Sequence, residues 1–510
     1  MARIVVVGAG LGGLAVAARL AAGGHSVTVC EQAPQVGGKL GVLAKDGFVF
    51  DTGPSLLTLP AVYRDLFLAT GGPLDAEVPL EPVDPVCAYR FPDGTALALP
   101  NASRPRIARA WDEALGRGAG DDWTAFLTRA AAIWDATRHT FLESPLQGTR
   151  SLLARARRVR DVRTVAPWLS LRDLGRRYLR FPQQRTVLDR YATYSGSDPR
   201  RAPAALATIP YVEQTFGAWY VPGGLHRLGD AVFDRAVDRG ATIRVGTPVA
   251  EILLAADRRR VYGVRLADGE RLPAQVVVAN ADAASVYRDL LPPQLGSAPL
   301  RALRRAQPSL SGFVLLLALR GRTPGLAHHT VLFPEDYDDE FDSVFGTGRR
   351  VGSGPRPVPE PTVYISSPDD AATRPEGSEA WFVLVNAPRH VPAGHEQAAG
   401  GRGVDWDAAG MRDTYADRVL AVLAARGLDV RDRIVWREIR TPADLERDTS
   451  SIGGSIYGTS SNGMRAAFLR PGNASPVPGL FLVGGSAHPG GGLPLVGLSA
   501  AIVAELIGAA

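Results

Sequence analysis

The sequence predicts an α/β protein with a parallel sheet, and similar patterns near the two ends of the chain support this. Residues 4–7 form an apolar run that leads directly into a glycine-rich turn and then into an Ala-rich segment. Residues 479–483 are again apolar and lead through glycines into the apolar segment 495–507. A buried strand, a glycine turn and a helix in this order are typical of Rossmann-type units.

The N-terminal segment is expected to run strand, turn, helix and strand. The apolar run 4–7 suits a buried parallel strand. Residues 14–22 read as a helix that two following glycines close. A second strand is expected at 26–30, with Glu31 at its end. This is the context in which a glycine fingerprint indicates a nucleotide site.

The turn after the first strand carries the G-x-G-x-x-G fingerprint on Gly8, Gly10 and Gly13, with Leu11 inside it. Gly8 permits the tight turn, Gly10 lets the backbone approach a diphosphate, and Gly13 lets the helix pack close to the strand. The helix N-terminus offers free N–H groups to the anion. Glu31 can accept hydrogen bonds from a ribose diol. The alternative is a glycine-rich packing turn, which requires neither the helix nor the acid in these places.

Composition narrows the class of protein. A chain of 510 residues predicts two or three domains, and 45% apolar with 21% charged residues is ordinary for a folded protein. Cys30 and Cys87 are too few for a disulfide framework or a Cys-rich zinc site, which favours a reducing cytoplasm. Glycines and Arg19 interrupt the apolar N-terminus, unlike a signal peptide. We expect no membrane-spanning segment, so any contact with a membrane is from one side.

The middle of the chain contains a second part of the same domain. A helix is expected from about 220 to 237, followed by strands at 242–245, 249–254, 261–266 and 275–280, which read as a helix and a β-meander. We therefore predict a discontinuous nucleotide-binding domain and an inserted α+β substrate domain. The first comprises 1–60, 216–294 and 441–510; the second comprises 61–215 and 295–440.

The segment 105–180 is expected to be mostly helical. From Trp123 to Phe141, apolar residues follow steps of three and four, which indicates either a core face or the wall of an apolar channel. Residues 155–180 contain nine arginines and two aspartates, a net charge of +7 against +5 for the whole chain. Interleaved apolar and aromatic residues favour an anionic membrane surface. The alternatives are a solvated helix or one that faces internal acids; nucleic acid is disfavoured because no binding motif accompanies the charge.

Several motifs resemble those of one superfamily. The run from Glu31 through Gly37, Gly38 and Lys39 is similar to the second FAD motif of the flavin amine oxidase and phytoene desaturase superfamily, in which Arg usually stands at the last position. The resemblance implies FAD, with the paired glycines near its diphosphate and ribityl chain. It also implies that the backbone of Val249 contacts the adenine.

The C-terminal glycine turn is the second cofactor site that this resemblance implies. Gly484 and Gly485 follow a predicted strand, and the closing helix is expected to begin at Leu495 and Val496. In the superfamily this helix N-terminus lies near N1 and O2 of the flavin. Its dipole would stabilise the negative charge that develops when the flavin accepts hydride.

The loop between these elements points to a narrower group. The run G-G-S-A-H-P-G-G-G-L-P-L-V, which contains His488, resembles the C-terminal signature of bacterial carotenoid desaturases, and residues 454–458 lean toward the hydroxy- or methoxycarotenoid 3,4-desaturase branch. The implied reaction passes a hydride from an allylic C–H to flavin N5 while the neighbouring carbon loses a proton. A membrane quinone or oxygen would reoxidise the flavin at the inner face of the cell membrane.

The catalytic residue is not identified by the sequence. His488 and Glu213 are weak candidates, and His488 more simply fixes the geometry of its loop. The adjacent His328 and His329 point in different directions without a completing ligand, so we predict no metal site. The alternative functions are a phytoene desaturase, a carotenoid oxygenase or saturase, and a redox-inactive isomerase or binding protein; an amine oxidase would need an aromatic cage.

Overall fold

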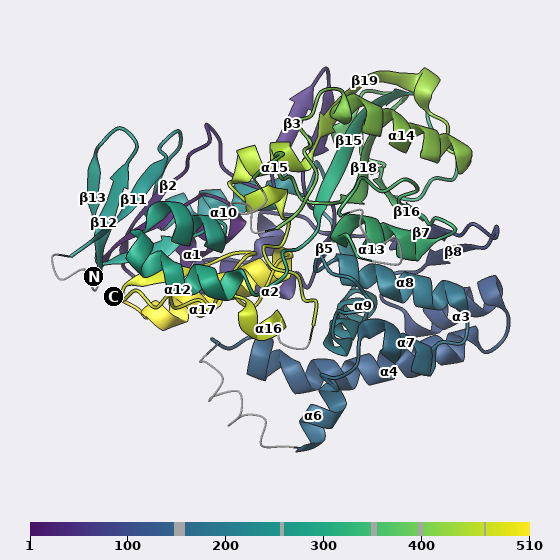
Figure 1. Cartoon of the computed structure of the whole chain (residues 1–510), viewed down its shortest axis with the longest axis horizontal. Helices are drawn as coiled ribbons and strands as arrows, with labels where there is room; N and C mark the ends of the chain where they lie inside the picture. Colours follow the sequence, from purple (N-terminus) through teal and green to yellow (C-terminus); the bar gives the residue numbers. More distant parts are fainter. Residues whose placement is uncertain (147–158, 256–259, 348–353, 396–400, 464–465) are drawn as a thin grey trace.

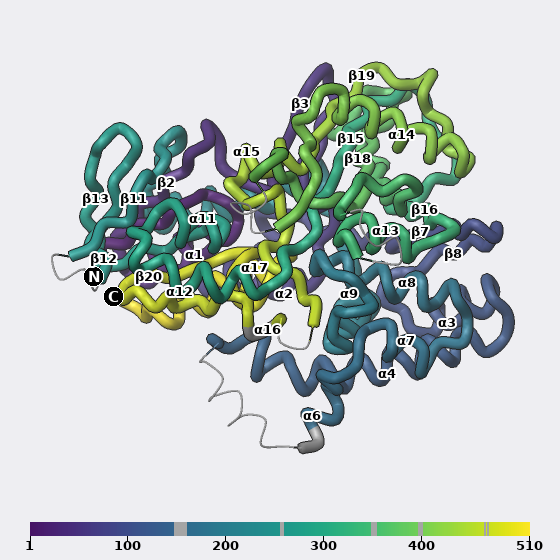
Figure 2. The backbone as a smooth tube through the Cα atoms, viewed as in Figure 1, coloured from purple at the N-terminus to yellow at the C-terminus, as the bar shows by residue number. Residues whose placement is uncertain are grey.

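The computed structural model describes residues 1–146, 159–255, 260–347, 354–395, 401–463 and 466–510. Figure 1 shows a parallel sheet near the two termini, a second sheet beside it and a group of helices below the second sheet. The purple N-terminal and yellow C-terminal segments lie side by side in Figure 2. The two ends of the chain therefore build the same unit.

Five parallel strands form the sheet of this unit, in the order β10-β2-β1-β14-β20. They are β1 (Arg3–Val7), β2 (Ser26–Cys30), β10 (Thr242–Arg244), β14 (Val276–Ala279) and β20 (Leu480–Leu482). The strands come from three separate stretches of sequence. The prediction of a meander in the middle stretch was wrong for two of its strands, because β10 pairs with β2 and β14 inserts between β1 and β20.

Alternate side chains of β1 face two different layers. Ile4 and Val6 pack with α1 (Leu11–Ala22), α2 (Ala61–Thr70), α10 (His226–Asp238) and α17 (Leu493–Ile507). Val5 and Val7 pack against an antiparallel sheet of β11 (Val249–Leu254), β12 (Val261–Leu266) and β13 (Arg271–Pro273). Since α2 belongs to this core, the unit extends beyond the domain boundary predicted at residue 60.

A seven-stranded sheet supports the rest of the chain. Its order is β19-β15-β18-β17-β16-β7-β8, with only the β16–β7 pair parallel among these strands. One face packs on α14 (Met411–Ala425), and the other packs on Phe48 and Phe50 of the β3–β4 hairpin. The strands are β7 (Cys87–Arg90), β8 (Ala96–Leu99), β15 (Ser311–Arg320), β16 (His329–Leu332), β17 (Val363–Ser366), β18 (Ser378–Ala387) and β19 (Ile434–Arg440).

The remaining elements connect these bodies. The strands are β3 (Val42–Lys45), β4 (Phe48–Asp51), β5 (Leu57–Thr58), β6 (Glu81–Pro82) and β9 (Ala218–Tyr220). The helices are α3 (Arg104–Leu115), α4 (Ala119–Thr137), α6 (Val159–Val165), α7 (Leu171–Tyr178), α8 (Pro182–Thr193), α9 (Thr208–Phe216), α11 (Ala283–Ser285), α12 (Pro293–Leu303), α13 (Tyr337–Phe345), α15 (Pro442–Thr449) and α16 (Ala466–Leu469).

The apolar stripe predicted from Trp123 to Phe141 lies mainly on α4 and forms a core face. Trp123, Phe126 and Ile133 are fully buried against neighbouring helices and the second sheet. The indole N–H of Trp123 donates to Gln214 Oε1 at 2.7 Å, which gives the buried nitrogen a partner. Among the alternatives for this stripe, the core face agrees with the structure.

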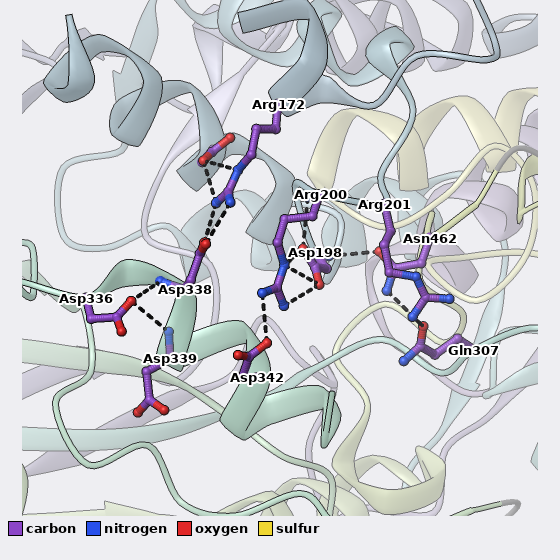
Figure 3. Close-up of polar contacts among 11 residues, drawn as sticks. Arg172, Asp198, Arg200, Arg201, Gln307, Asp336, Asp338, Asp339, Asp342 and Asn462 are labelled. Atoms are coloured by element: carbon purple, nitrogen blue, oxygen red, sulfur yellow. Dashed lines mark hydrogen bonds and ion pairs between the residues drawn. The ribbon is translucent and has the colours of Figure 1, made fainter. Parts of the chain in front are cut away.

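Three arginines of the basic segment, Arg172, Arg176 and Arg180, pair with acids of the protein. Arg172 on α7 is bonded to Asp189 Oδ2 at 2.8 Å and to Asp338 on α13 (Figure 3), and Arg180 is paired with Asp122. Arg163, Arg176 and Arg177 are exposed. Arginines 155, 157 and 158 lie outside the described residues, and nothing is described of the side chain at 160. Throughout the described ranges, every helix is too short or too polar to cross a membrane.

Candidate functional site

A cavity of about 610 Å³ opens at the carboxyl ends of the parallel strands. Val7, Cys30, Asn280 and Val483, which end or follow four of these strands, all line it. From there the cavity reaches the seven-stranded sheet, where Phe382 and other apolar side chains line it. Ligands of open α/β sheets bind at this edge, and the volume is typical of a small-molecule site.

The predicted fingerprint lines one end of the cavity. Gly8, Gly10 and Leu11 are lining residues, whereas Gly13 lies behind them. A Cβ at Gly13 would stand 2.1 Å from the carbonyl oxygen of Gly8, so the close approach of helix and strand requires glycine. Helix α1 begins after Gly10 without a side-chain cap, which leaves its first N–H groups available to a diphosphate.

The second glycine pair crosses over the first. The N–H of Gly37 donates to Ala9 O at 3.0 Å, and a Cβ at Gly38 would lie 3.3 Å from the Cα of Gly10. Gly38 also lines the cavity. Two backbone turns therefore meet where side chains would fill the space, and this arrangement fits the diphosphate of a dinucleotide.

Glu31 lies where a ribose is expected. Its carboxylate accepts hydrogen bonds from Ala9 N at 2.6 Å and Ala33 N at 2.9 Å, which fix it at the cavity wall. A carboxylate has about four acceptor sites, so two backbone donors leave capacity for a ribose hydroxyl. Val249, the predicted adenine contact, lines the same cavity.

Lys39 is a buried cation at the centre of the site. Its ammonium donates to the carbonyl oxygens of Ser455, at 3.1 Å, and Ile456, at 2.8 Å. Burial lowers the pKa of Lys39 to about 8, and Asp282 opposes that shift. Asp282 also caps α11 by accepting from Ala284 N at 2.9 Å. Burial raises the pKa of Asp282, while Lys39 lowers it.

Arg470 holds the same loop from the other side. Its guanidinium donates to the carbonyl oxygens of Tyr457, Gly485 and Thr459 at 2.9, 2.7 and 2.6 Å. Burial lowers its pKa to about 10, and Asp282 again opposes the shift. Neither Arg470 nor Asp282 was predictable from the sequence, because neither stands within a motif of fixed spacing.

The C-terminal glycine turn faces the other side of the cavity. Gly484, Gly485 and Val496 line it, but Leu495 does not. Helix α17 begins two residues before its predicted start, at Leu493, and Gly492 before it provides no side-chain cap. The N-terminus of α17 can therefore direct free N–H groups and a positive dipole end at a negative charge in the cavity.

Neither weak catalytic candidate lies on the cavity wall. His488 is fully buried, its Nε2–H donates to Ser144 O at 3.0 Å, and burial lowers its pKa. Its ring meets the edge of Phe141, which ties the loop to the end of the α4 segment. Glu213 is buried on α9, accepts from Tyr191 OH at 2.5 Å and has a pKa raised by burial. This geometry favours positioning roles for both.

A larger cleft of about 1400 Å³ lies elsewhere, beside α13. Its charged residues pair with one another, for example Arg200 with Asp342 (Figure 3) and Arg356 with Asp339. None of the predicted cofactor residues lines it. The smaller cavity is therefore the candidate site, since it joins both glycine turns to an apolar region.

Two glycine turns, two uncapped helix N-termini and an acid at the end of β2 define a dinucleotide-binding oxidoreductase of the flavin type. The family model described as flavin containing amine oxidoreductase matches residues 11–373, and the chain belongs to this family. It is an FAD-dependent oxidoreductase, which confirms the predicted cofactor and the resemblance to the superfamily.

Relatives with curated names cover nearly the whole chain. A "4,4'-diapolycopene oxygenase" from Methylomonas sp. is 33% identical over 99% of this chain and 98% of its own. A "1-hydroxycarotenoid 3,4-desaturase" from Flavobacterium sp. (strain P99-3) is 31% identical over 99% of both chains. A "zeta-carotene-forming phytoene desaturase" from Myxococcus xanthus is 32% identical over 99% of this chain and 93% of its own.

Solved structures support the fold. The cyclohexylamine oxidase from Brevibacterium oxydans IH-35A matches with a TM-score of 0.61 at 15% identity, covering 99% of each chain. This likeness confirms the flavin amine oxidase-like α/β fold and carries nothing about the substrate.

Proposed function

We propose that the protein is a carotenoid desaturase that introduces the C-3,4 double bond into a 1-hydroxylated acyclic or monocyclic carotenoid. The observation that carries the proposal is one cavity that joins the FAD-binding turns to an apolar arm. The arm is lined by Leu56, Leu310, Val314, Phe382 and Leu384. An apolar arm of this kind suits a polyene, and the names of the full-length relatives agree with that class.

FAD, when bound, supplies the hydride acceptor. The residues of the chain contribute orientation, exclusion of water and stabilisation of charge. The apolar arm holds the polyene dry and in position beside the glycine turns. The uncapped N-terminus of α17 lies at the cavity, and its dipole would stabilise the negative charge that develops on a bound flavin during hydride transfer.

The cavity wall offers no free carboxylate as a base among the described residues. Glu31 accepts from two backbone N–H groups, and Asp282 caps α11. Asp289 and Asp448 are paired with neighbouring arginines. A polyene spreads the positive charge left by hydride loss, so the C–H proton on the neighbouring carbon becomes acidic. A weak proton acceptor is then sufficient. We therefore assign no side chain as the base.

The nearest alternatives are a phytoene desaturase, which makes several double bonds, and an oxygenase of terminal methyl groups. The oxygenase name of the 33% identical relative favours the second alternative. A saturase or a redox-inactive isomerase on the same fold would use the same cavity.

Product analysis separates these functions. The purified holoprotein would be incubated with phytoene and, separately, with a 1-hydroxylated acyclic carotenoid. The products would be separated by chromatography and their masses determined by mass spectrometry. We expect loss of two hydrogens from the hydroxylated substrate. Turnover of phytoene alone would overturn the 3,4-assignment, and gain of oxygen would favour the oxygenase. An unchanged mass with an altered elution time would indicate an isomerase.

We further propose that the protein works at the cytoplasmic face of an anionic membrane and passes electrons to a quinone or to oxygen. The exposed Trp168, with 57% of its surface accessible, and the exposed Arg163, Arg176 and Arg177 support the membrane contact. Aromatic and cationic side chains together favour adsorption to lipid head groups.

A further inference from the structure

An arginine on α8 faces the cavity without a partner. Arg190 lines the cavity and is 7% exposed. Among the residues that the structure describes, it forms no ion pair, and its side chain makes no hydrogen bond; its Nε is buried and unsatisfied. The ring centroids of Tyr194 and Tyr364 lie 5.2 and 5.3 Å from the guanidinium carbon. Two aromatic faces thus hold the cation in place.

Two other buried arginines among the described residues have hydrogen-bond partners, unlike Arg190. Arg470 donates to three backbone carbonyls. Arg235, also under a tenth exposed, donates to Phe67 O at 2.9 Å and is paired with Glu77. A buried guanidinium carries five donors and a charge, and leaving them unpaired is costly. The donors of Arg190 are therefore available to an oxygen atom in the cavity.

The groups around Arg190 do not neutralise it by direct contact. The buried carboxyls of Glu213 and Glu340 lie near enough for Arg190 to oppose the rise in their pKa that burial causes, yet neither forms an ion pair with it. His329 stacks on Tyr364 with centroids 5.7 Å apart, and burial lowers its pKa to about 4, which keeps it neutral.

The tyrosine that holds Arg190 also connects it to the cavity-lining loop after β4. The hydroxyl of Tyr364 lies 2.6 Å from Ser55 Oγ, and Ser55 belongs to the loop after β4, which lines the cavity together with Gly53 and Pro54. A ligand atom that meets Arg190 therefore stands close to this loop, while the apolar arm extends along β15 and β18 through Val314, Phe382 and Leu384.

We propose that Arg190 binds the oxygen of a polar end group on the substrate, a hydroxyl or a carbonyl, and thereby selects oxygenated carotenoids over hydrocarbons. This inference rests on the proposed function and names the residue that sets its substrate class. A hydroxyl or carbonyl oxygen accepts from the guanidinium, whereas a hydrocarbon end would displace water from the same donors and leave them unsatisfied. A site built to hydrogen-bond a polar group rejects the analogue that lacks it.

The test is a comparison of binding with two ligands. Dissociation constants of the holoprotein would be measured, without an electron acceptor, for a 1-hydroxylated acyclic carotenoid and for the hydrocarbon of the same carbon skeleton. We expect the wild type to prefer the hydroxylated ligand about 10- to 100-fold, the worth of one hydrogen bond to a charged group. Arg190→Met should reduce this preference to about 1 with unchanged FAD content.

Two further variants make the result specific. Arg185→Met changes an arginine on the same helix that does not line the cavity, and it should leave the preference unchanged. Arg190→Lys keeps a cationic donor and should retain part of the preference for the hydroxylated ligand. This variant also tests the proposal if Arg190→Met does not fold. A preference that survives in Arg190→Met, or loss of FAD together with equal loss of both ligands, would overturn the proposal.

The outcomes also separate this inference from the proposed function. A wild type that binds both carotenoids equally, or prefers the hydrocarbon, would overturn the role of Arg190 and leave a carotenoid desaturase in place. A wild type that binds neither carotenoid would refute the proposed function, and the role of Arg190 would fail with it.

Discussion

Replacing Gly13 with alanine should separate α1 from the first strand. A Cβ at this position would stand 2.1 Å from the carbonyl oxygen of Gly8 and 3.1 Å from the side chain of Asn280. Contacts below 3.0 Å are essentially absent from real structures, so the helix must move by about 1 Å. The carbonyl belongs to the backbone and cannot rotate away, and the helix is buried on most of its surface.

The expected cost follows from two opposing effects. Alanine in a helix is favoured over glycine by about 1 kcal/mol, so without the clash Gly13→Ala would stabilise the protein. Overpacking a core costs about 1–3 kcal/mol, and a rigid backbone contact belongs at the upper end. We expect a net loss of about 2 kcal/mol, which lowers the melting temperature of a 510-residue chain by about 2 °C.

The assay is calorimetric melting of the apoprotein together with FAD content from the visible flavin absorbance. Gly72→Ala is the matched control, because a Cβ there has only the end of an arginine side chain nearby, at 3.8 Å. The control should keep the wild-type melting temperature and FAD content. If Gly13→Ala has the same melting temperature and FAD content as Gly72→Ala, the reasoning is refuted. The close approach of α1 to β1 would then not require glycine at position 13.

Two further predictions concern the cofactor and the membrane. In Gly10→Ala the new Cβ comes closest to the rotatable amide of Asn280, at 2.9 Å, and its next neighbour is Gly37 O at 3.9 Å. The melting temperature should therefore hold, while FAD affinity in equilibrium dialysis falls about 10-fold or more. Unchanged affinity would contradict a backbone contact with the diphosphate. In sedimentation with anionic liposomes, replacing Arg176 and Arg177 with glutamine should weaken binding about 10- to 30-fold, since each cation contributes about 1 kcal/mol. The same change at the exposed Arg304 and Arg305 is the control, and equal losses would argue against this surface.

The nucleotide half of the site was predictable because local sequence determines it. A diphosphate is held mainly by backbone N–H groups, which require glycines at fixed spacing between a strand and a helix. Gly8, Gly10 and Glu31 line the cavity together. The strand pairing was less accessible: β14 has an ordinary apolar sequence, and only long-range packing places it between β1 and β20.

The part of the cavity proposed to bind the substrate could not be predicted, because no local stretch of sequence determines it. Its wall is built from side chains on α8, β15, β17 and β18, which lie far apart in the sequence and share no spacing. Arg190 stands among many arginines, and nothing adjacent marks it as the one without a partner. That property depends on the distant Tyr364, on Ser55 that holds its hydroxyl, and on acids that stay outside ion-pair distance. Substrate choice in this fold is therefore a property of three-dimensional packing, and a change at Arg190 should alter it without disturbing the glycine turns that bind FAD.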